Sequence, residues 1–302
     1  MAKRDFLTLL DCSPAELGAL TERAAELKRT HLAGENHRSL AGRTGALILQ
    51  VSSTRTRVAF EAGMAQLGGQ AIFLSPADTQ LGRGEPISDT ARVLSQMVDV
   101  AMIRILSHDD LETFAAAADI PVINAMTARY HPCQLLADVQ TFEELRGPIG
   151  GRRVAFIGDG YNMCSSYINA AGQWGFELRL ACPPGHEPPA SALATGNAHL
   201  FETPQEAVEG AHLVVTDVWS SIGHEEEQAQ RRERFAPYQV SEALLDGAAD
   251  GTLFLHCLPA HRGEEVNATV LDDPRSGAWV AAGNRLHSQK ALLEFLLLDH
   301  SS

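Results

Sequence analysis

Residues 46–57 read Ala46-Leu47-Ile48-Leu49-Gln50-Val51-Ser52-Ser53-Thr54-Arg55-Thr56-Arg57, an apolar run followed by clustered hydroxyl and guanidinium groups. The apolar run predicts a buried strand, and Val58 to Leu67, which end at Gly68-Gly69, predict a helix. The cluster therefore lies at a strand-to-helix junction, where free backbone N–H groups and the helix dipole favour a phosphate. Arginine adds a planar fork that grips phosphate oxygens in pairs. An ordinary capped helix with a solvated charged face would show the same local pattern.

Short aliphatic runs alternate with helix-like segments along the whole chain, which is typical of parallel strands joined by crossover helices. The fold class predicted is α/β, with two doubly wound parallel-sheet domains. The turn-rich segment 145–151 separates residues 1–146 from residues 147–285. The C-terminal segment 286–302, with a helix over Leu286 to Leu298, is expected to pack back on the first domain. The predicted strands are Ala46–Val51, Ala71–Leu74, Ala101–Ile105, Pro121–Ala125, Val154–Gly158, Leu178–Cys182, Leu213–Asp217, Leu253–Leu258 and Ala278–Ala281.

Polar residues follow nearly every predicted strand. Ligands of open α/β sheets gather at the carboxyl ends of the strands, so these residues are candidates for binding. We therefore expect the site to lie in the cleft between the two domains. The candidates are Ser53–Arg57, Arg104, His131 with Gln134, Asp159-Gly160-Tyr161-Asn162, Asp217 and His256-Cys257-Leu258-Pro259.

Composition indicates a soluble globular protein: the 302 residues are 45% hydrophobic and 21% charged. No apolar run approaches the roughly 20 residues of a membrane span. The first residues lack the apolar core of a signal peptide, which predicts a cytoplasmic protein. The net charge of −14 argues against binding to nucleic acid or acidic membranes. The five cysteines are odd in number and lack paired spacing, so a disulfide framework is not expected. A metal site is not expected either, because His131/Cys133 and His256/Cys257 lack the usual ligand spacings.

Three of the candidates have simpler structural explanations. Arg104 ends an apolar run, where it serves either as an anion or carbonyl ligand or as the partner of a nearby carboxylate. His131 either caps the next helix or, with Gln134 one turn on, binds the oxygen and amide of a carbamoyl unit. Cys257 is either a nucleophile or a buried inert thiol.

Two further stretches of the second half carry glycine and polar residues that favour binding. Val154 to Gly160 resembles the start of a dinucleotide-binding loop, but Met163 stands at the third glycine position, which argues against nicotinamide or flavin. Asp217 precedes Ser220-Ser221-Ile222-Gly223, which suits a mobile loop that grips an ammonium group. The alternative is a turn into an acidic solvated helix, and Glu225–Glu227 fit that alternative.

Taken together and in this order, the motifs resemble those of the transcarbamylase family, and most closely its ornithine branch. The resemblance covers essentially the whole chain. Its markers are Ser53-Thr54-Arg55-Thr56-Arg57, Gln80-Leu81-Gly82-Arg83-Gly84-Glu85, Asp89-Thr90-Ala91-Arg92, His131-Pro132-Cys133-Gln134, Asp217-Val218-Trp219-Ser220-Ser221, His256-Cys257-Leu258-Pro259 and Asn284-Arg285.

The resemblance implies a carbamoyltransferase that uses carbamoyl phosphate and L-ornithine and forms a homotrimer with active sites at subunit interfaces. It implies no metal and no organic cofactor. The implied phosphate ligands are Ser53, Thr54, Arg55 and Thr56, with Arg57 supporting the loop and Gln80 reaching into a neighbouring subunit's site. Thr56, Arg104 and His131 would donate to the carbonyl oxygen, and Gln134 and the Leu258 carbonyl would hold the carbamoyl amide. Ornithine would contact Asn162, Asp217, Ser221 and Ile222, with Cys257 and Arg285 near the reacting centre.

The chain departs from the family pattern around the implied site. Gln50-Val51 replace Glu-Lys, Thr127-Ala128 replace Ser-Asp, Tyr161 replaces asparagine, Ile222 replaces methionine and Gly283 replaces glutamate. The loss of one charge contact costs about 1–3 kcal/mol of substrate affinity. Two alternatives to an ornithine enzyme therefore stay open: a carbamoyltransferase with a different amine substrate, and a catalytically weak paralogue that binds carbamoyl phosphate.

Overall fold

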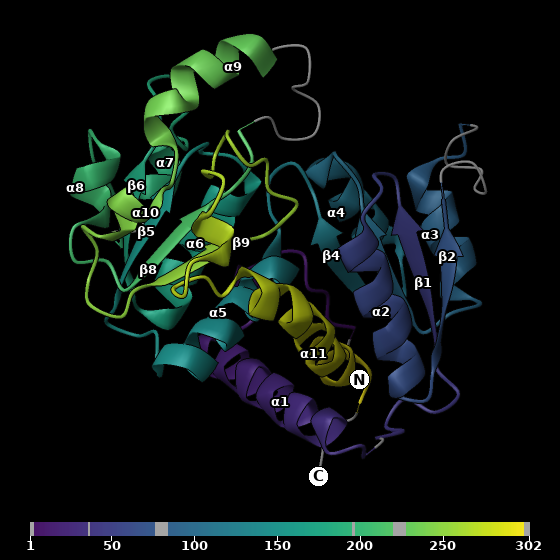
Figure 1. The fold of residues 1–302 in the computed structure, drawn as a ribbon. Helices are drawn as coiled ribbons and strands as arrows, with labels where there is room; N and C mark the ends of the chain where they lie inside the picture. Colours follow the sequence, from purple (N-terminus) through teal and green to yellow (C-terminus); the bar gives the residue numbers. More distant parts are fainter. Residues whose placement is uncertain (1–2, 36, 76–83, 195–196, 220–227, 299–302) are drawn as a thin grey trace. The chain divides into compact units, whose positions relative to one another are not determined.

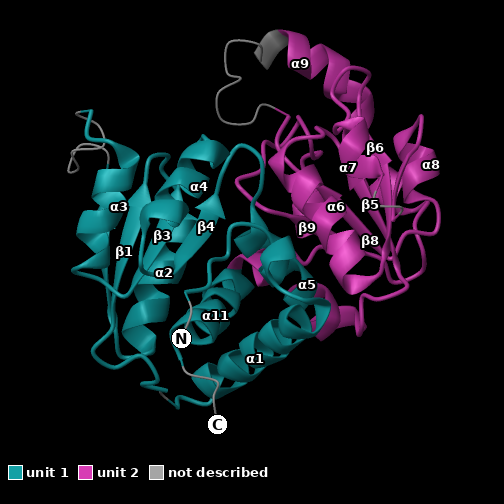
Figure 2. Cartoon of the chain, turned by 180° about the vertical axis from the view of Figure 1, so that it is seen from behind, with its two compact units in different colours: residues 1–140, 283–302 teal, residues 141–282 magenta. Residues whose placement is uncertain are grey.

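The structure, a computed structural model, describes residues 3–35, 37–75, 84–194, 197–219 and 228–298. The chain forms two compact units (Figure 2), and each is built around one parallel sheet with helices against it. Unit 1 comprises residues 1–140 and 283–302, and unit 2 comprises residues 141–282. None of the helices in the described ranges has the length and apolarity that crossing a bilayer requires.

The sheet of unit 1 has four parallel strands in the order β2-β1-β3-β4 (Figure 1). Its strands are β1 (Thr44–Leu49), β2 (Gln70–Leu74), β3 (Val100–Arg104) and β4 (Val122–Met126). Buried aliphatic side chains of β1, β3 and β4 pack against α4 in one core, which includes Ile48, Ile103, Leu111 and Val122. The helices and turns of this unit are η1 (Leu9–Asp11), α1 (Pro14–Leu32), α2 (Thr54–Gln66), α3 (Ile87–Ser95), α4 (His108–Ala117) and most of α5 (Pro132–Arg146) and α11 (Ala278–Leu297).

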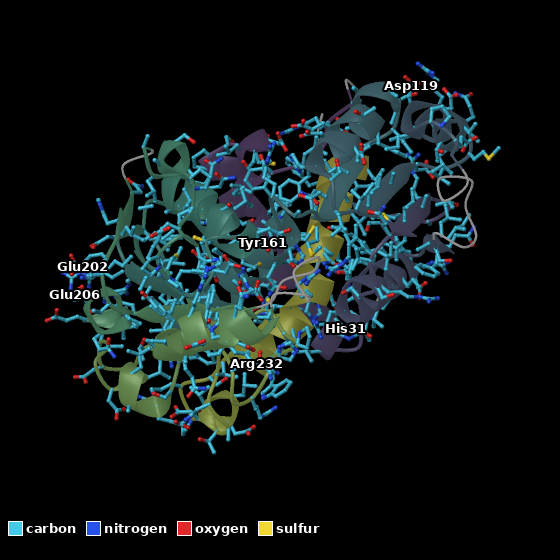
Figure 3. All side chains as sticks on the ribbon, turned by 90° about the horizontal axis from the view of Figure 1, so that it is seen from above. His31, Asp119, Tyr161, Glu202, Glu206 and Arg232 are labelled. Atoms are coloured by element: carbon cyan, nitrogen blue, oxygen red, sulfur yellow. The ribbon has the colours of Figure 1, made fainter. Side chains whose placement is uncertain are left out.

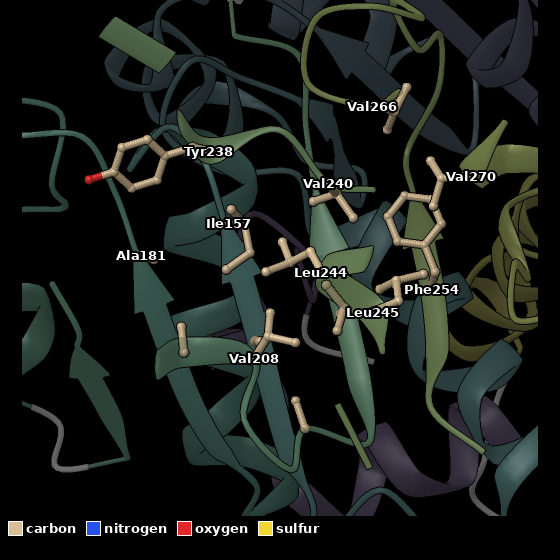
Figure 4. Packing of buried hydrophobic residues seen from close by; sticks show 14 of the residues in the cluster. Ile157, Ala181, Val208, Tyr238, Val240, Leu244, Leu245, Phe254, Val266 and Val270 are labelled. Atoms are coloured by element: carbon tan, nitrogen blue, oxygen red, sulfur yellow. The ribbon is translucent and has the colours of Figure 1, made fainter. Parts of the chain in front are cut away.

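The sheet of unit 2 has five parallel strands in the order β7-β6-β5-β8-β9. Its strands are β5 (Arg153–Ile157), β6 (Glu177–Ala181), β7 (Ala198–Leu200), β8 (Leu213–Thr216) and β9 (Leu253–His256). Figure 4 shows its buried core, in which Val208, Leu244 and Phe254 lie among other hydrophobic side chains. The remaining elements are α6 (Asn162–Trp174), α7 (Ala190–Leu193), α8 (Pro204–Val208), α9 (Gln228–Phe235), η4 (Ala236–Tyr238), α10 (Glu242–Leu245) and η5 (Val270–Asp272).

Helix ends follow local chemistry. Ser13 caps α1 through a reciprocal capping box with Glu16, and Pro14 occupies the first turn, where its missing N–H costs nothing. Gly175 ends α6 with φ of 70°, a left-handed conformation that glycine adopts without penalty.

Charged side chains such as Glu202 and Glu206 lie at the outer margin of the molecule (Figure 3).

In each sheet the strand order reverses at one point, so that the connections from two adjacent central strands run to opposite sides of the sheet. In unit 1 this point lies between β1 and β3, and in unit 2 it lies between β5 and β8. In open α/β sheets the loops diverge at such points and leave a crevice outside the carboxyl ends of the strands, which is where ligands bind. The polar residues that follow β1, β3 and β4, and those that follow β5, β8 and β9, thus gather at one edge of their own sheet.

The predicted α/β class with two parallel sheets is confirmed, and eight of the predicted strands exist with ends shifted by one or two residues. The ninth, Ala278–Ala281, was wrong, because these residues form the first turn of α11. Ala278 and Ala281 are buried while Trp279 and Val280 are exposed, which is the helical period of burial. A four-residue aliphatic run is too short to distinguish the two-residue period of a strand from the 3.6-residue period of a helix. Strand β7 was not predicted, because it is short and its last two residues are exposed.

Candidate active site

The hydroxyl and arginine cluster of unit 1 opens helix α2. Ser53 is the N-cap, and its Oγ accepts from the backbone N–H of Thr56 at 3.3 Å and donates to Thr56 Oγ1 at 3.2 Å. Register pairing places Leu49, the last residue of β1, beside Arg104, the last residue of β3. The predicted junction of strand and helix is confirmed. A helix N-terminus rich in hydroxyl groups therefore lies beside an arginine at the switch point of this sheet.

Arg285, on α11, joins this junction to helix α5. Its side chain is buried, and its Nη1 donates to Gln134 Oε1 at 2.7 Å while its Nη2 donates to Thr56 Oγ1 at 3.3 Å. The amide of Gln289, oriented with its oxygen toward the guanidinium, accepts from Nε and Nη2 of Arg285 at 3.0 and 2.8 Å. The planar fork of arginine thus holds three side chains from three helices in one arrangement.

These contacts orient the hydroxyl of Thr56 and the amide of Gln134. Thr56 Oγ1 accepts from both Arg285 and Ser53, so its two lone pairs are occupied and its own proton is directed elsewhere. Gln134 Nε2 donates to Asp138 Oδ1 at 2.9 Å, and this fixes which end of the amide faces Arg285. One lone pair of Gln134 Oε1 remains for a ligand N–H. The pair therefore offers one donor and one acceptor, as a carbamoyl group requires.

His131 directly precedes α5 and is buried. Burial is the largest cause that lowers the pKa of His131 well below its usual value, and the positive charges of Arg285, Arg104 and Arg55 act in the same direction. The imidazole is therefore neutral and has one N–H to donate. The clustering of Arg55, Arg104 and Arg285 gives unit 1 a strongly positive spot on a chain with net charge −14.

Arg57 belongs to a different face of α2 from this cluster. Its Nε donates to Glu61 at 3.1 Å, and its guanidinium lies 3.8 Å from the centre of the Phe73 ring. The bond to Glu61 lies within α2, and the stacking on Phe73 ties the start of α2 to β2.

The departures from the family pattern in unit 1 are accommodated locally. Gln50 Oε1 accepts from the Leu106 backbone N–H at 3.0 Å, a contact that a glutamate oxygen can also make. Thr127 Oγ1 accepts from the backbone N–H groups of Arg129 and Tyr130 at 3.3 and 3.1 Å, a role open to serine as well. A Cβ placed on Gly283 meets no atom of the described residues within 4 Å, so packing does not impose glycine there.

In unit 2, Asp217 and Cys257 form a pair at the carboxyl ends of β8 and β9. Thr216 and His256 are register partners, so the residues that follow them lie side by side. Cys257 Sγ donates to Asp217 Oδ1 at 2.9 Å, and the backbone N–H of Val218 donates to the same oxygen at 2.7 Å. Cys257 is partly exposed, whereas the other four cysteines are buried. A carboxylate beside a partly exposed thiol is suited to contact a small cationic ligand.

The backbone after Cys257 is held by a buried histidine and glutamate. His256 Nδ1 accepts from the Leu258 N–H at 2.8 Å, so the ring proton is on Nε2, which lies 3.2 Å from Glu265 Oε1. Glu265 Oε1 also accepts from the His261 N–H at 2.6 Å. Leu258 has φ of 56°, an uncommon conformation for a residue with a Cβ. The ring of His256 fixes the backbone at the residue whose carbonyl is a predicted ligand.

Helix α6 begins at Asn162, which is buried, and Tyr161 at its N-cap is half-buried (labelled in Figure 3). Burial raises the pKa of Tyr161, and the nearby Asp159 carboxylate raises it further. A Cβ on Gly160 would lie 2.4 Å from the backbone N of Pro188, so this glycine is required by the chain's own backbone. That close approach fills the space beside Gly160 with the backbone of residues 186–188.

Arg231 on α9 was not predicted as part of this site. It is buried and forms an ion pair with Asp159, and its Nε donates to the Trp219 carbonyl at 2.6 Å. It therefore joins the end of the β8 loop to the segment before α6. Its sequence context, Gln230-Arg231-Arg232-Glu233-Arg234, resembles a solvated charged helix face, so only the fold reveals the burial of Arg231. Asp138, Gln289 and Glu265 were not predicted as site residues either.

Three predicted site residues, Gln80, Ser221 and Ile222, lie outside the described residues. The structure brings Ser53, Thr56, Gln134 and Arg285 together by hydrogen bonds, and it places Arg55, Arg104 and His131 close enough to interact electrostatically. Within unit 2 it brings Asp217 and Cys257 together and holds the backbone of Leu258 through His256. Thr54 lies in the first turn of α2, and Asn162 opens α6.

Cys257 is expected to be the single fast-reacting thiol of the native protein. Burial raises the pKa of Cys12 and of Cys133 to about 12, and a hydrogen bond with Cys182 together with burial raises the pKa of Cys164. Since the thiolate is the reactive form and Cys182 is also buried, these four groups should react at least about tenfold more slowly than Cys257. Titration with a disulfide reagent should release one equivalent rapidly from the native protein and none from the C257S variant. A rapid equivalent that survives in C257S would contradict this assignment.

Comparisons with known proteins agree with both units. Residues 4–144 match the family model described as "Aspartate/ornithine carbamoyltransferase, carbamoyl-P binding domain", and residues 150–296 match the model of its "Asp/Orn binding domain". An ornithine carbamoyltransferase of Chromohalobacter salexigens is 59% identical over 99% of each chain. An anabolic ornithine carbamoyltransferase of Pseudomonas aeruginosa is 58% identical over 100% of this chain and 99% of its own.

Solved structures agree with these sequence relatives. Ornithine carbamoyltransferase from Burkholderia thailandensis superposes with a TM-score of 0.91 at 47% identity, covering 98% of this chain and 99% of its own. The enzyme from Pyrococcus furiosus superposes with a TM-score of 0.93 at 44% identity, covering 98% and 97%. By fold and by its paired polar clusters, the protein is thus an α/β transferase of two parallel-sheet units. The chain belongs to the aspartate/ornithine carbamoyltransferase family.

Proposed function

We propose that the protein transfers the carbamoyl group of carbamoyl phosphate to the δ-amine of L-ornithine, giving L-citrulline and phosphate in arginine biosynthesis. The observation that carries the proposal is the network in which Arg285 orients Thr56 and Gln134 beside a neutral, arginine-flanked His131. This network offers donors to one carbonyl oxygen, an acceptor to one amide, and positive charge to one phosphate. Those are the three groups of carbamoyl phosphate.

The phosphate and the amino acid are assigned to different units. In unit 1, the opening turn of α2 from Ser53 to Thr56 takes the phosphate, because its N–H groups and Arg55 favour an anion. In unit 2, Asp217 takes the ammonium group of the amino acid, with Asn162 and Cys257 beside it. The Leu258 carbonyl takes the carbamoyl amide. Transfer itself requires that the two ligands meet when both are bound.

The reaction begins when the uncharged δ-amine attacks the carbamoyl carbon. Negative charge then grows on the carbonyl oxygen, where Thr56, Arg104 and His131 would donate, and afterwards on the departing phosphate beside Arg55. Donors that are already oriented stabilise this charge more in the transition state than in the ground state. The bond between carbon and the bridging phosphate oxygen breaks, and the phosphate takes the proton that the amine loses. Arg285 acts by fixing Thr56 and Gln134 before the substrate arrives.

A panel of amines tests the substrate. The purified protein is supplied with carbamoyl phosphate and, separately, with ornithine, lysine, putrescine, acetylornithine or aspartate, and the carbamoylated product is measured. Product with ornithine at a rate far above the others supports the proposal. A preference for another amine overturns the ornithine assignment and keeps the chemistry. No product with any amine, from a folded protein that binds carbamoyl phosphate, indicates a binding paralogue.

Replacing Val51 by lysine is expected to strengthen binding of carbamoyl phosphate. Val51 lies two residues before the N-cap Ser53, and lysine there restores a cation near the phosphate-binding turn. One added charge contact contributes about 1–3 kcal/mol, so the KM for carbamoyl phosphate should fall about tenfold. The matched change Q50E should have little effect, because the oxygen that accepts from Leu106 is retained. An unchanged KM in V51K would show that position 51 does not face the phosphate.

We further propose that the protein assembles as a homotrimer in which Gln80 reaches a neighbouring subunit's site. The resemblance to the family supports this assembly. Light scattering after size-exclusion chromatography should give three times the mass of one chain, or a multiple of it. A monomer that turns over carbamoyl phosphate would overturn this part of the proposal without touching the chemistry.

A further inference from the structure

A histidine and two glutamates cluster in unit 2 on the segment after β9, apart from the residues assigned above to the substrates. His261, Glu264 and Glu265 each offer one ligand atom, and these atoms lie within 4.8 Å of one another. His261 Nδ1 lies 3.9 Å from Glu264 Oε2 and 4.0 Å from Glu265 Oε2. The spacing is local, since the three residues stand at positions i, i+3 and i+4.

The two carboxylate oxygens that face His261, Glu264 Oε2 and Glu265 Oε2, accept no hydrogen bond from the described residues. Glu265 is fully buried, and its Oε1 accepts from the His261 N–H and lies 3.2 Å from His256 Nε2. Its Oε2 is buried and accepts no hydrogen bond from any residue that the structure describes. Glu264 shows the same division: its Oε1 pairs with Arg232 (labelled in Figure 3), whereas its Oε2 is buried without a described donor. Burying two carboxylate oxygens without a donor is costly, so a ligand shared between them would be stabilising.

Charge around the cluster favours a cation. Two carboxylates face the position between the three ligand atoms, and Arg232 contacts only the far oxygen of Glu264. Arg262 points elsewhere, since its Nε donates to the Ala268 carbonyl at 3.2 Å and its Nη2 to Asp272 at 3.4 Å. His261 is exposed at 46% of its side chain, which leaves a path for an ion to reach the cluster from solvent.

The geometry points to a binding site for a divalent transition-metal ion, formed by His261 Nδ1, Glu264 Oε2 and Glu265 Oε2. One imidazole and two carboxylates form the nitrogen and oxygen donor set that zinc, cobalt and similar ions accept. With metal–ligand bonds of about 2.0–2.2 Å, neighbouring donor atoms lie roughly 3–4 Å apart, so a small contraction completes the site. The sequence predicted no metal site, because His131/Cys133 and His256/Cys257 lack the usual ligand spacings.

Glu265 links the proposed metal site to the backbone after β9, because it also contacts His256. The same carboxylate that binds the ion through Oε2 holds His256 through Oε1, and His256 in turn accepts from the Leu258 N–H. In known metal sites, ligands are commonly oriented by such outer contacts. The bound ion therefore restrains the segment from His256 to Glu265.

Cobalt binding tests the site directly. Protein freed of metal with a chelator is titrated with Co²⁺ by calorimetry, and the visible spectrum is recorded in parallel. We expect one Co²⁺ per chain, with affinity falling on the order of 100-fold in H261A and in E264Q, since each removes one of three ligands. H199A removes another exposed histidine of unit 2 and is expected to bind as the unchanged protein does.

Two further measurements distinguish Co²⁺ binding at this site from Co²⁺ binding by the Cys257 thiol. Ligation by Cys257 would produce a sulfur-to-cobalt charge-transfer band, which we expect to be absent, and C257S should bind Co²⁺ unchanged. Bound Co²⁺ should also raise the unfolding temperature of the unchanged protein and not that of H261A. The inference is overturned if binding is not saturable, if H261A binds as tightly as the unchanged protein, or if C257S loses the ion. If Co²⁺ does not bind at this site, the proposed carbamoyl transfer is not affected, because the amine panel tests it independently.

Discussion

The R285K variant is expected to lose about 100- to 10,000-fold in kcat while remaining folded, because lysine replaces a fork by a single point charge. Arg285 Nη1 and Nη2 hold Gln134 and Thr56 at 2.7 and 3.3 Å, and lysine cannot reach both. Hydrogen bonds from a charged donor are worth about 1.5–3 kcal/mol each, and losing two gives the range above. Steady-state kinetics with carbamoyl phosphate and ornithine measure the loss.

The matched control for this variant is R23K. Arg23 also contacts α11, since its Nε donates to Glu294 at 2.7 Å, but it is partly exposed and plays no part in the proposed site. R23K should keep nearly full activity, which separates an effect on α11 packing from an effect on the site. Circular dichroism and thermal unfolding check that both variants fold. If folded R285K stays within about fivefold of the unchanged enzyme, the orienting role of Arg285 is wrong.

The D217N variant is expected to raise the KM for ornithine about 100-fold and to leave carbamoyl phosphate binding unchanged. Asparagine keeps an oxygen to accept from the Val218 N–H, which lies 2.7 Å from Asp217 Oδ1, so the local backbone is preserved. It removes the charge that would pair with an ammonium group, and such a contact is worth about 1.5–3 kcal/mol. Calorimetry with carbamoyl phosphate and kinetics with varied ornithine measure the two effects separately.

The D273N variant makes the same chemical change elsewhere in unit 2. Asp273 pairs with Arg275 at 2.9 Å, and the hydrogen bond from the Arg275 side chain lowers the pKa of Asp273. D273N should not alter the KM for either substrate. Equal shifts in D217N and D273N would mean that the effect is structural, and an unchanged KM for ornithine in D217N would remove Asp217 from the amine site.

Sequence patterns predicted the two sheets well because parallel strands buried on both faces are short aliphatic runs bounded by turns. They failed at Ala278–Ala281, where only burial on every third residue distinguishes the start of α11 from a strand. They also predicted most residues at the strand ends, because topology places those ends at one edge of the sheet. They did not identify Arg231, whose neighbours in the sequence are charged and exposed.

Local chemistry in the sequence by itself determined the alternation of strands and helices and which polar groups follow each strand. Ser53 follows a predicted strand and precedes a predicted helix, and the order of the motifs already indicates the family. What only the tertiary structure decided is which of these groups meet. Thr56 and Arg285 are 229 residues apart, and Asp217 and Cys257 are 40 apart. Hydrogen bonds act over about 3 Å, so contacts between such distant residues depend on sheet register and helix packing, which no local pattern contains.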